Sequence, residues 1–344
     1  MNEAMEALQS DLKSLPKVVM IVFIVVYYAR FTSSLLRPGL PRFLSVLPVI
    51  SLLPFIPFTF STIHFRGISG FFLTWLCLFK LLLLSFGQGP LNPSLPLISF
   101  ISLATLPVKL QVDPQPKQLT TLSPKLLIST AIRAALLSVL FSIYRFKEEL
   151  NYYVLLLMYC VHIYLFLELV LSTSAITSQL LGMELEPQFN KPYFTTSLRD
   201  FWGRRWNLMV SAILRPSIYE PAKIYFGPLG GVLAAFLTSG LMHELMFYYN
   251  NLRKPTGEVT AFFVLHGVCV VVEWYWAKHQ KWWCPPRVVA TPLTLGFVAG
   301  TAFCLFFPPL IRGRTDEKVL AEIAAIMDLM KETGRWLRLT DCVN

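Results

Sequence analysis

Charged side chains are scarce in this sequence of 344 residues. They make up 15% of it, whereas hydrophobic residues make up 55% and the mean hydropathy is +0.56. A typical soluble domain carries about 25% charged residues, so this chain has too little polar surface to cover itself in water. The composition disfavours a soluble enzyme, a disordered tail and a secreted disulfide scaffold. It predicts an integral membrane protein.

The sequence also lacks three patterns that would suggest other functions. No two of the six cysteines have the spacing of a zinc-ligand pair, so the sequence predicts no metal site and no disulfide framework. No Asn-x-Ser/Thr glycosylation sequence occurs, because Asn92 is followed by Pro93. No internal repeat is found, which argues against the transporter folds that are built from repeated halves.

Positive charge exceeds negative charge, with 30 lysines and arginines against 20 aspartates and glutamates. Most of the basic residues lie between apolar runs, where such residues contact anionic lipid head groups. No basic patch interleaved with aromatic side chains lies on a polar face, so we expect no nucleic-acid partner. The basic residues divide almost evenly between the two sides of the membrane and therefore do not fix the orientation.

Apolar runs predict the fold class, because a helix needs about 20 apolar residues to cross a bilayer. Eight runs qualify: residues 18–36, 43–60, 68–86, 126–144, 152–181, 226–249, 259–277 and 288–310. A shorter run, 95–108, is either a ninth span or a re-entrant or interfacial segment. The sequence thus predicts an all-α polytopic bundle of eight or nine transmembrane helices, with residues 1–344 forming one domain.

Ionic residues within these runs are costly, at roughly 2.5–3.5 kcal/mol or more each at mid-bilayer when unpaired. Arg30 is near the end of its run, where its side chain is expected to reach the membrane surface. Four others are expected to form interior ion pairs, whose pairing the sequence does not reveal: Lys80, Arg133, Glu168 and Glu273.

The five histidines differ in their surroundings. His64 and His279 lie in loops or at the ends of runs, where solvated side chains are expected. His162 and His266 lie within runs, where a lone histidine is usually a hydrogen-bonded structural residue. His266 and Glu273 share a helix face but are two turns, about 10 Å, apart, so they are not expected to touch.

His243 has a more suggestive environment than the other four. Ser239 and Gly240 precede it by four and three residues and lie on the same helix face. Small residues there either let another backbone approach or leave room for a substrate beside the ring. Glu244 lies about 100° around the helix and is a poor candidate to orient the imidazole. The pair does not form an HExxH zinc motif, because position 247 is phenylalanine.

A second unusual segment is the aromatic and basic stretch FWGRRWN at residues 201–207. Alternating aromatics and arginines at a membrane boundary often form an interfacial belt. Asn207 ends the stretch, and its carboxamide is either a hydrogen-bond donor to a substrate or a capping or packing group.

Together, these two segments resemble the membrane-bound O-acyltransferase family. Its members are polytopic and carry an asparagine after an FW…WN-like segment, followed in a later helix by an intramembrane histidine and a glutamate. The longer strings PQFNKPYFTTSLRDFWGRRWNLMVS, SGLMHELMF, FFVLHGVC and LFFPPL are similar to the plant wax synthase (jojoba-type) branch, the long-chain-alcohol O-fatty-acyltransferases. The likeness spans most of the chain and is densest over residues 187–310.

The resemblance implies acyl transfer from acyl-CoA to a lipid hydroxyl inside a tunnel within the endoplasmic reticulum membrane. A thioester is an activated donor, so the enzyme mainly needs positioning, a base and a stabilised oxyanion. His243 would be the base, since burial disfavours imidazolium, and Asn207 would hold the thioester or the oxyanion. Candidate substrate-binding residues are Trp202, Arg204, Arg205, Trp206 and Ser239, the two arginines as partners of CoA phosphates or of lipid head groups.

Acyl-CoA and a lipid alcohol are the expected partners, in a membrane, with no metal or prosthetic group. Sterol or diacylglycerol acylation is the alternative of the same chemistry. A transporter with His162, His243 and Glu168 as proton-relay groups is the alternative from another class. Residues 187–310 are the expected catalytic region. Residues 311–344 are expected to form an amphipathic tail on the membrane or on the bundle, because apolar residues recur there at helical spacing.

Overall fold

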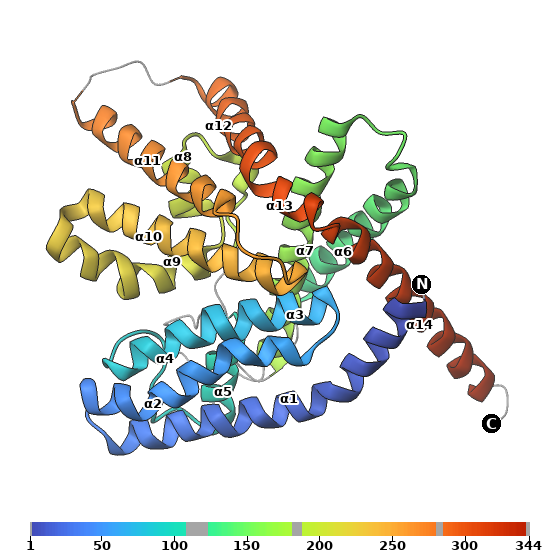
Figure 1. The fold of residues 1–344 in the computed structure, drawn as a ribbon, viewed down its shortest axis with the longest axis horizontal. Coiled ribbons are helices and arrows are strands. Elements are labelled where there is room, and N and C mark those ends of the chain that lie inside the picture. The colour runs from blue at the N-terminus through green and yellow to red at the C-terminus, as the bar shows by residue number, and fades with distance from the viewer. Residues whose placement is uncertain (1, 108–122, 181–187, 280–284, 342–344) are drawn as a thin grey trace.

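The computed structural model of the chain describes residues 2–107, 123–180, 188–279 and 285–341. Within these ranges all regular secondary structure is helical (Figure 1). Eight helical segments among the described residues are long and apolar enough to cross a bilayer. The predicted all-α polytopic bundle is therefore confirmed.

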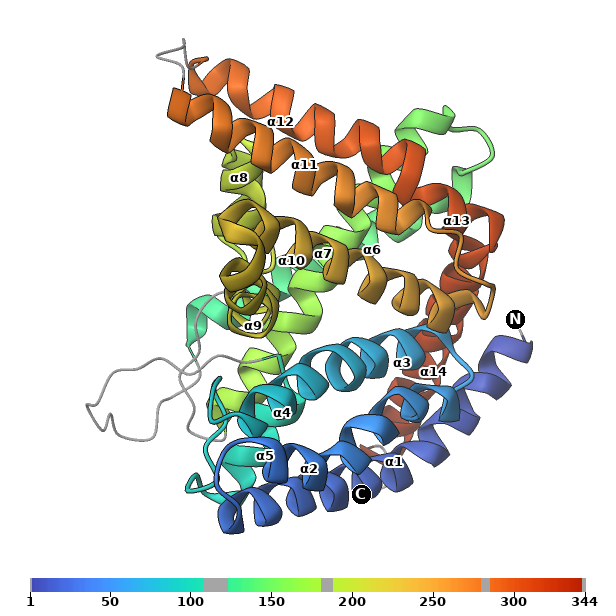
Figure 2. The same cartoon turned by 60° about the vertical axis from the view of Figure 1, so that its left-hand side comes forward.

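The fourteen α-helices of the described residues follow one another in this order: α1 (Asn2–Leu35), α2 (Leu40–Leu52), α3 (Ile63–Ser69), α4 (Leu78–Ser85), α5 (Leu97–Thr105), α6 (Pro124–Ile143), α7 (Tyr152–Leu180), α8 (Leu198–Asp200), α9 (Leu208–Leu214), α10 (Glu220–Asn251), α11 (Glu258–His279), α12 (Arg287–Thr301), α13 (Phe307–Arg312) and α14 (Thr315–Asp341). Figure 2 shows α3 and α4 between α2 and α10, with α11 and α12 on the opposite side of α10. The first five helices enclose one apolar core, and α6, α7, α10, α11 and the turn before α13 enclose another.

The short apolar run at residues 95–108 does not form a ninth span. Its helix, α5, has nine residues and is therefore about 14 Å long, less than half the thickness of a bilayer core. Phe100 and Leu103 are fully buried against the N-terminal helices. The run is thus a short helix packed on the bundle.

A helical hairpin lies where the sequence predicted a single span over residues 226–249. Helix α9 leads through a π-helical turn, Arg215–Tyr219, into α10, and the chain reverses at Gly227, where φ is 70°. Only glycine adopts such a backbone conformation freely. A Cβ atom on Gly231 would lie 2.9 Å from the Tyr219 carbonyl oxygen, which shows how closely the two arms approach.

Two of the four charges expected in interior ion pairs do pair with each other. Arg133 of α6 forms a salt bridge with Glu168 of α7, and the Tyr164 hydroxyl also donates to Glu168 at 2.9 Å. The prediction is confirmed for this pair. A hydrogen-bonded pair inside the bundle avoids the cost of an isolated charge.

The ion-pair prediction is wrong for the other two. Lys80 is completely buried, and its Nζ donates to the carbonyl oxygens of Leu103 at 2.6 Å and Leu106 at 2.7 Å. It caps the C-terminus of α5, where carbonyl groups lack helical partners. Glu273 accepts backbone N–H bonds from Leu198 and Arg199, both at 2.9 Å, and so caps the start of α8. Each charge is balanced by peptide dipoles at a helix end.

The tail expected at residues 311–344 contains helix α14, which packs against α1, α3 and α13. Its inner face includes Leu320, Glu322 and Ala325, the last of them fully buried. Met327 and Met330 of the same helix are exposed. The described part of α14 is therefore held on the bundle by a face of mixed polarity.

Candidate active site

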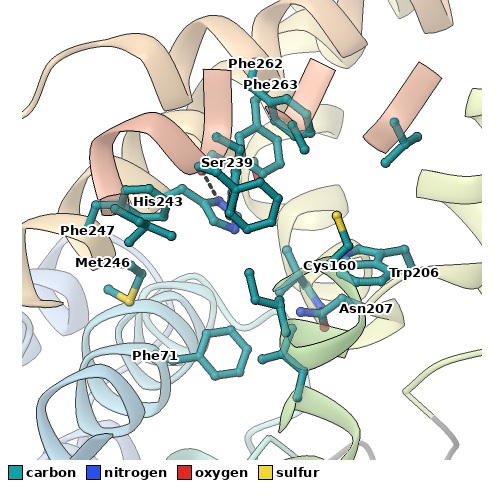
Figure 3. A pocket seen from close by; sticks show the side chains of 18 of the residues that line it. Phe71, Cys160, Trp206, Asn207, Ser239, His243, Met246, Phe247, Phe262 and Phe263 are labelled. Carbon is teal, nitrogen blue, oxygen red and sulfur yellow. Dashed lines mark hydrogen bonds between the residues drawn. The ribbon is translucent and has the colours of Figure 1, made fainter. Parts of the chain in front are cut away.

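A cavity of about 890 Å³ lies among α3, α7, α9, α10, α11, α13 and α14. Five of the seven candidate catalytic or substrate-binding residues line it: Trp202, Trp206, Asn207, Ser239 and His243. Figure 3 shows the His243 ring and the Asn207 carboxamide facing this pocket from different elements. The lining is otherwise mostly aromatic and aliphatic, which suits a long acyl chain.

Irregular helix turns shape this cavity. Four π-helical turns interrupt the helices of the described region: Gly70–Cys77, Phe201–Arg205, Arg215–Tyr219 and Ala302–Phe306. Each contributes side chains to the cavity wall. A π turn rotates the following side chains relative to a regular helix, and such turns are frequent at functional sites.

The hydrogen bond of His243 determines which ring nitrogen is free. Its Nδ1 lies 2.7 Å from the carbonyl oxygen of Ser239, one turn earlier in α10. A carbonyl oxygen only accepts hydrogen bonds, so Nδ1 carries the proton and Nε2 of the neutral ring keeps its lone pair. Ser239 and His243 were predicted to share a helix face. In the structure the backbone carbonyl of Ser239 orients the His243 imidazole.

Aromatic rings hold the imidazole from two directions. The ring of Phe263 stacks on His243 with centroids 4.2 Å apart, and Trp75 meets it edge-on at 4.8 Å. Trp75 is almost fully buried. These contacts restrict the ring to one orientation, which a reactive group needs.

Gly240 and Glu244 fix the neighbouring helix rather than the imidazole. A Cβ atom on Gly240 would lie 2.9 Å from the Thr260 Cα, so the small residue permits α11 to pack closely on α10. The Glu244 carboxylate accepts the Thr260 backbone N–H at 3.1 Å. Both contacts secure the first turns of α11 and hence the position of Phe263 over His243.

Asn207 combines an unusual backbone with a capping side chain. Its φ is 40° and ψ is 66°, in the left-handed region, which asparagine tolerates better than most residues. Its Oδ1 accepts the Val210 N–H at 3.4 Å, at the N-terminus of α9. With Oδ1 turned toward the helix, the Nδ2 group is the remaining donor of the carboxamide.

Trp202 is positioned by a chain of hydrogen bonds that ends on α12. Its indole N–H donates to Nδ1 of His266 at 3.0 Å. Because that nitrogen accepts, Nε2 of the neutral His266 ring carries the proton and donates to the Thr301 hydroxyl at 2.9 Å, which in turn donates to the Phe297 carbonyl. The geometry gives the fully buried His266 a structural function, as the sequence indicated.

Arg204 and Arg205 are not among the described residues that line the cavity. Arg205 binds Asp200 at 2.5 Å and the carbonyl oxygens of Asn190 and Lys191, and so fixes the preceding loop. Arg204 is exposed.

Two arginines that sequence reasoning missed do line the cavity. Arg199 and Arg215 are both exposed and are both part of its wall. Arg215 also contacts Glu220 at 3.3 Å. Asn207 lies outside the regular helix and Arg215 begins a π-helical turn, so helical periodicity gave no signal for Arg215.

His64 was expected to be solvated, and this prediction is wrong. Its Nδ1 lies 2.6 Å from Glu322 of α14, and His64 lines the cavity. The two residues are 258 positions apart, so no local sequence pattern reveals the contact. His162 lines the same cavity.

Among the described residues, no three His, Cys, Asp or Glu side chains are arranged to hold a metal ion.

Comparison of the sequence with known proteins identifies the family. Residues 185–265, which include both Asn207 and His243, match the model of the "Membrane bound O-acyl transferase family". The chain is 42% identical over 337 residues to a probable long-chain-alcohol O-fatty-acyltransferase 1 of Arabidopsis thaliana, covering 94% of this chain and 98% of that protein.

Two further relatives carry different acceptor names. The chain is 40% identical to the long-chain-alcohol O-fatty-acyltransferase of Simmondsia chinensis, with 91% of this chain and 94% of that protein covered. It is also 40% identical to an acyl-CoA–sterol O-acyltransferase 1 of Arabidopsis thaliana, with 92% and 96% covered.

Proposed function

Because the chain belongs to the membrane-bound O-acyltransferase family and is an acyltransferase, we propose that it esterifies a long-chain fatty alcohol with the acyl group of acyl-CoA to form a wax ester. The observation that carries the proposal is the hydrogen bond from His243 Nδ1 to the Ser239 carbonyl. It leaves Nε2 as a free base facing an apolar cavity, which is the group that such a transfer requires.

His243 is the proposed general base. Its Nε2 takes the hydroxyl proton as the alcohol oxygen attacks the thioester carbonyl carbon. The C–O bond forms, the C–S bond breaks, and the imidazolium returns the proton to the departing CoA thiolate. The reaction thus consumes no net proton, and base assistance of this kind is worth about 10²–10⁴ in rate.

Asn207 is the proposed donor to the carbonyl oxygen of the thioester. Its Oδ1 caps α9, and the Nδ2 group is left to donate to the negative charge that develops on that oxygen. A preorganised donor at such a position contributes about 10²–10³ to the rate of acyl transfer. Trp202 and Trp206 line the wall beside it and would pack on the acyl chain.

We place the CoA head group at Arg199 and Arg215 rather than at Arg204 and Arg205. Arg199 and Arg215 are each exposed and each line the cavity, and guanidinium groups bind phosphates through paired hydrogen bonds. The acyl chain would extend inward from there, so the cavity would act as a tunnel. We infer the endoplasmic reticulum as the membrane, in keeping with the resemblance.

Sterol acylation is the second candidate. The chain is as similar to the sterol O-acyltransferase as to the Simmondsia chinensis fatty-alcohol enzyme, at 40% identity over nearly the whole length. Apolar pockets discriminate weakly between acceptors of similar bulk. The proton-relay transporter is disfavoured, because membership of an acyltransferase family accounts for Asn207 and His243 together.

The acceptor is tested by expressing the chain in cells that lack neutral-lipid synthases. Microsomes receive labelled palmitoyl-CoA with hexadecanol, a sterol or diacylglycerol, and the esters are resolved by chromatography. Microsomes without the chain are the control. We expect wax ester with hexadecanol. Ester with the sterol or diacylglycerol alone would retain the chemistry and replace the acceptor, whereas no ester with any of them would overturn the proposal.

A further inference from the structure

One part of the cavity wall carries polar groups that the proposed acyl transfer does not use. We call it the α14 cluster and define it by five residues that line the cavity: His64, Tyr144, Tyr159, His162 and Asp316. They come from α3, from the end of α6, from α7 and from α14. An enzyme that handled only a hydrocarbon chain here would need none of them, because an unpaired polar group inside an apolar cavity is costly.

Glu322 fixes the orientation of His64 in this cluster. The carboxylate accepts the backbone N–H groups of Ile63 at 2.6 Å and His64 at 3.1 Å, at the start of α3. It also lies 2.6 Å from His64 Nδ1. Since a carboxylate only accepts, Nδ1 donates to it, and Nε2 of the neutral ring is left as a hydrogen-bond acceptor.

His162 lies beside His64 on the same wall. The Phe166 ring is 5.7 Å from His64 and 6.5 Å from His162, measured between centroids. His162 Nδ1 is 3.3 Å from the Tyr144 hydroxyl. One nitrogen of each imidazole therefore has a protein partner, and the other has none among the described residues.

The rest of the cluster is also held in place. Tyr159 donates to Asp316 at 2.9 Å, and Lys147 Nζ lies 3.9 Å from the same carboxylate. Nearby, the Thr315 hydroxyl is buried without a hydrogen-bond partner in the described part of the chain, although Thr315 lines the cavity and is only 5% exposed. An unsatisfied buried hydroxyl is unfavourable unless a ligand can reach it.

Asn250 connects the proposed base with the part of the cavity wall formed by α3. Asn250 follows His243 by seven residues in α10, which places it on the same helix face about 10 Å farther along. Asn250 lines the cavity and its Oδ1 approaches Gly67 of α3, one turn after His64. The carboxamide oxygen is also buried without a partner among the described residues.

We propose that the α14 cluster binds a second hydroxyl group of the acceptor, so that long-chain diols are preferred acceptors. The inference rests on the proposed alcohol acylation at His243. A hydroxyl both donates and accepts, which matches two imidazoles that each present one free nitrogen. An anionic group would lie near the carboxylates of Glu322 and Asp316 and is disfavoured by their charge.

The test compares acceptors that differ only in the second hydroxyl. The full chain in microsomes receives labelled acyl-CoA and a series of α,ω-diols, each paired with the monohydric alcohol of the same length. We expect the ratio of kcat/KM for diol to that for monohydric alcohol to peak at one chain length, where the distal hydroxyl reaches the cluster. A peak of about tenfold corresponds to one buried hydrogen bond.

Two variants locate the preference, and folded protein is quantified for each. His64→Gln and His162→Phe are expected to flatten the peak, whereas Val319→Ala, an apolar change in α14 on the same cavity, should retain it. A flat ratio in the parent chain, or a peak that persists in both histidine variants, would overturn the proposal. Absence of ester from every monohydric alcohol would instead overturn the proposed function, and this inference with it.

Discussion

The N-terminal helices and the cavity-forming helices use buried polar residues in opposite ways. In α1 to α5, Lys80 is fully buried and its ammonium group donates hydrogen bonds to two carbonyl oxygens. In α9 to α11, His243 and Asn207 each use one polar atom for local structure and leave the other unpaired at the cavity. Burial alone therefore does not identify a functional residue; a free atom at the cavity does.

After His243, Asn207 gives the largest expected effect, because its side chain is the proposed donor to the oxyanion. Two variants separate this function from that of its backbone. Glycine adopts the positive φ of this position freely, whereas alanine does not. If the carboxamide stabilises the oxyanion, Asn207→Gly and Asn207→Ala both lose ester formation by about 10²-fold or more. Rates are measured per folded protein. Near-parental activity of Asn207→Gly would show that only the backbone conformation of this residue matters, and that its carboxamide does not take part in the reaction.

Lys80 tests whether a buried polar residue of the N-terminal helices serves stability alone. Lys80→Met keeps the length of the side chain but leaves the Leu103 and Leu106 carbonyl groups unsatisfied, at about 1–3 kcal/mol each. We expect a clear drop in the unfolding temperature of the detergent-solubilised protein and unchanged ester formation per folded molecule. A variant of parental stability that is catalytically inactive would show that Lys80 acts on the reaction.

His266 is a buried structural residue that acts on a residue of the cavity wall. It accepts a hydrogen bond from Trp202 but does not itself line the cavity. His266→Phe removes the acceptor of the indole N–H, and we expect kcat/KM to fall about tenfold, the size of one buried hydrogen bond. Thr301→Val breaks only the outer link of the chain and should cost less. Equal losses in both variants would indicate a general packing defect.

Glu322 and Asp11 give the smallest and most specific comparison. Asp11 accepts the Ser61 and Thr62 N–H groups and Glu322 accepts the next two, so both cap the start of α3. Glu322→Gln and Asp11→Asn should each lower stability by about 1 kcal/mol. Only Glu322→Gln should also alter the diol preference, because only Glu322 contacts the His64 ring.

Local patterns in the sequence were sufficient for part of this picture. Hydropathy located the eight spans, and helical periodicity placed Ser239 beside His243, which the structure turns into a backbone hydrogen bond. The partners of Lys80, Glu273 and His64 were not accessible in this way. Each binds a group that another segment of the chain supplies. The sequence alone therefore does not distinguish such a residue from a member of an ion pair or from a solvated residue.

The helical hairpin was hidden for a related reason. The sequence predicted a span only over residues 226–249, because no apolar run of similar length directly precedes position 226. The π turns were likewise not predicted, since no sequence rule locates them. These irregular elements place Asn207 and Arg215 on the cavity wall, so the least predictable backbone carries the residues of the proposed reaction.

The base assignment at His243 is tested most directly by the rate of ester formation in His243→Ala, measured per folded protein in microsomes with palmitoyl-CoA and hexadecanol. Leu241→Ala, an exposed residue two positions earlier in α10, is the matched control. The account predicts a fall of about 10²–10⁴ for His243→Ala, with the control close to the parent chain. An His243→Ala variant that forms wax ester at the parental rate would contradict it.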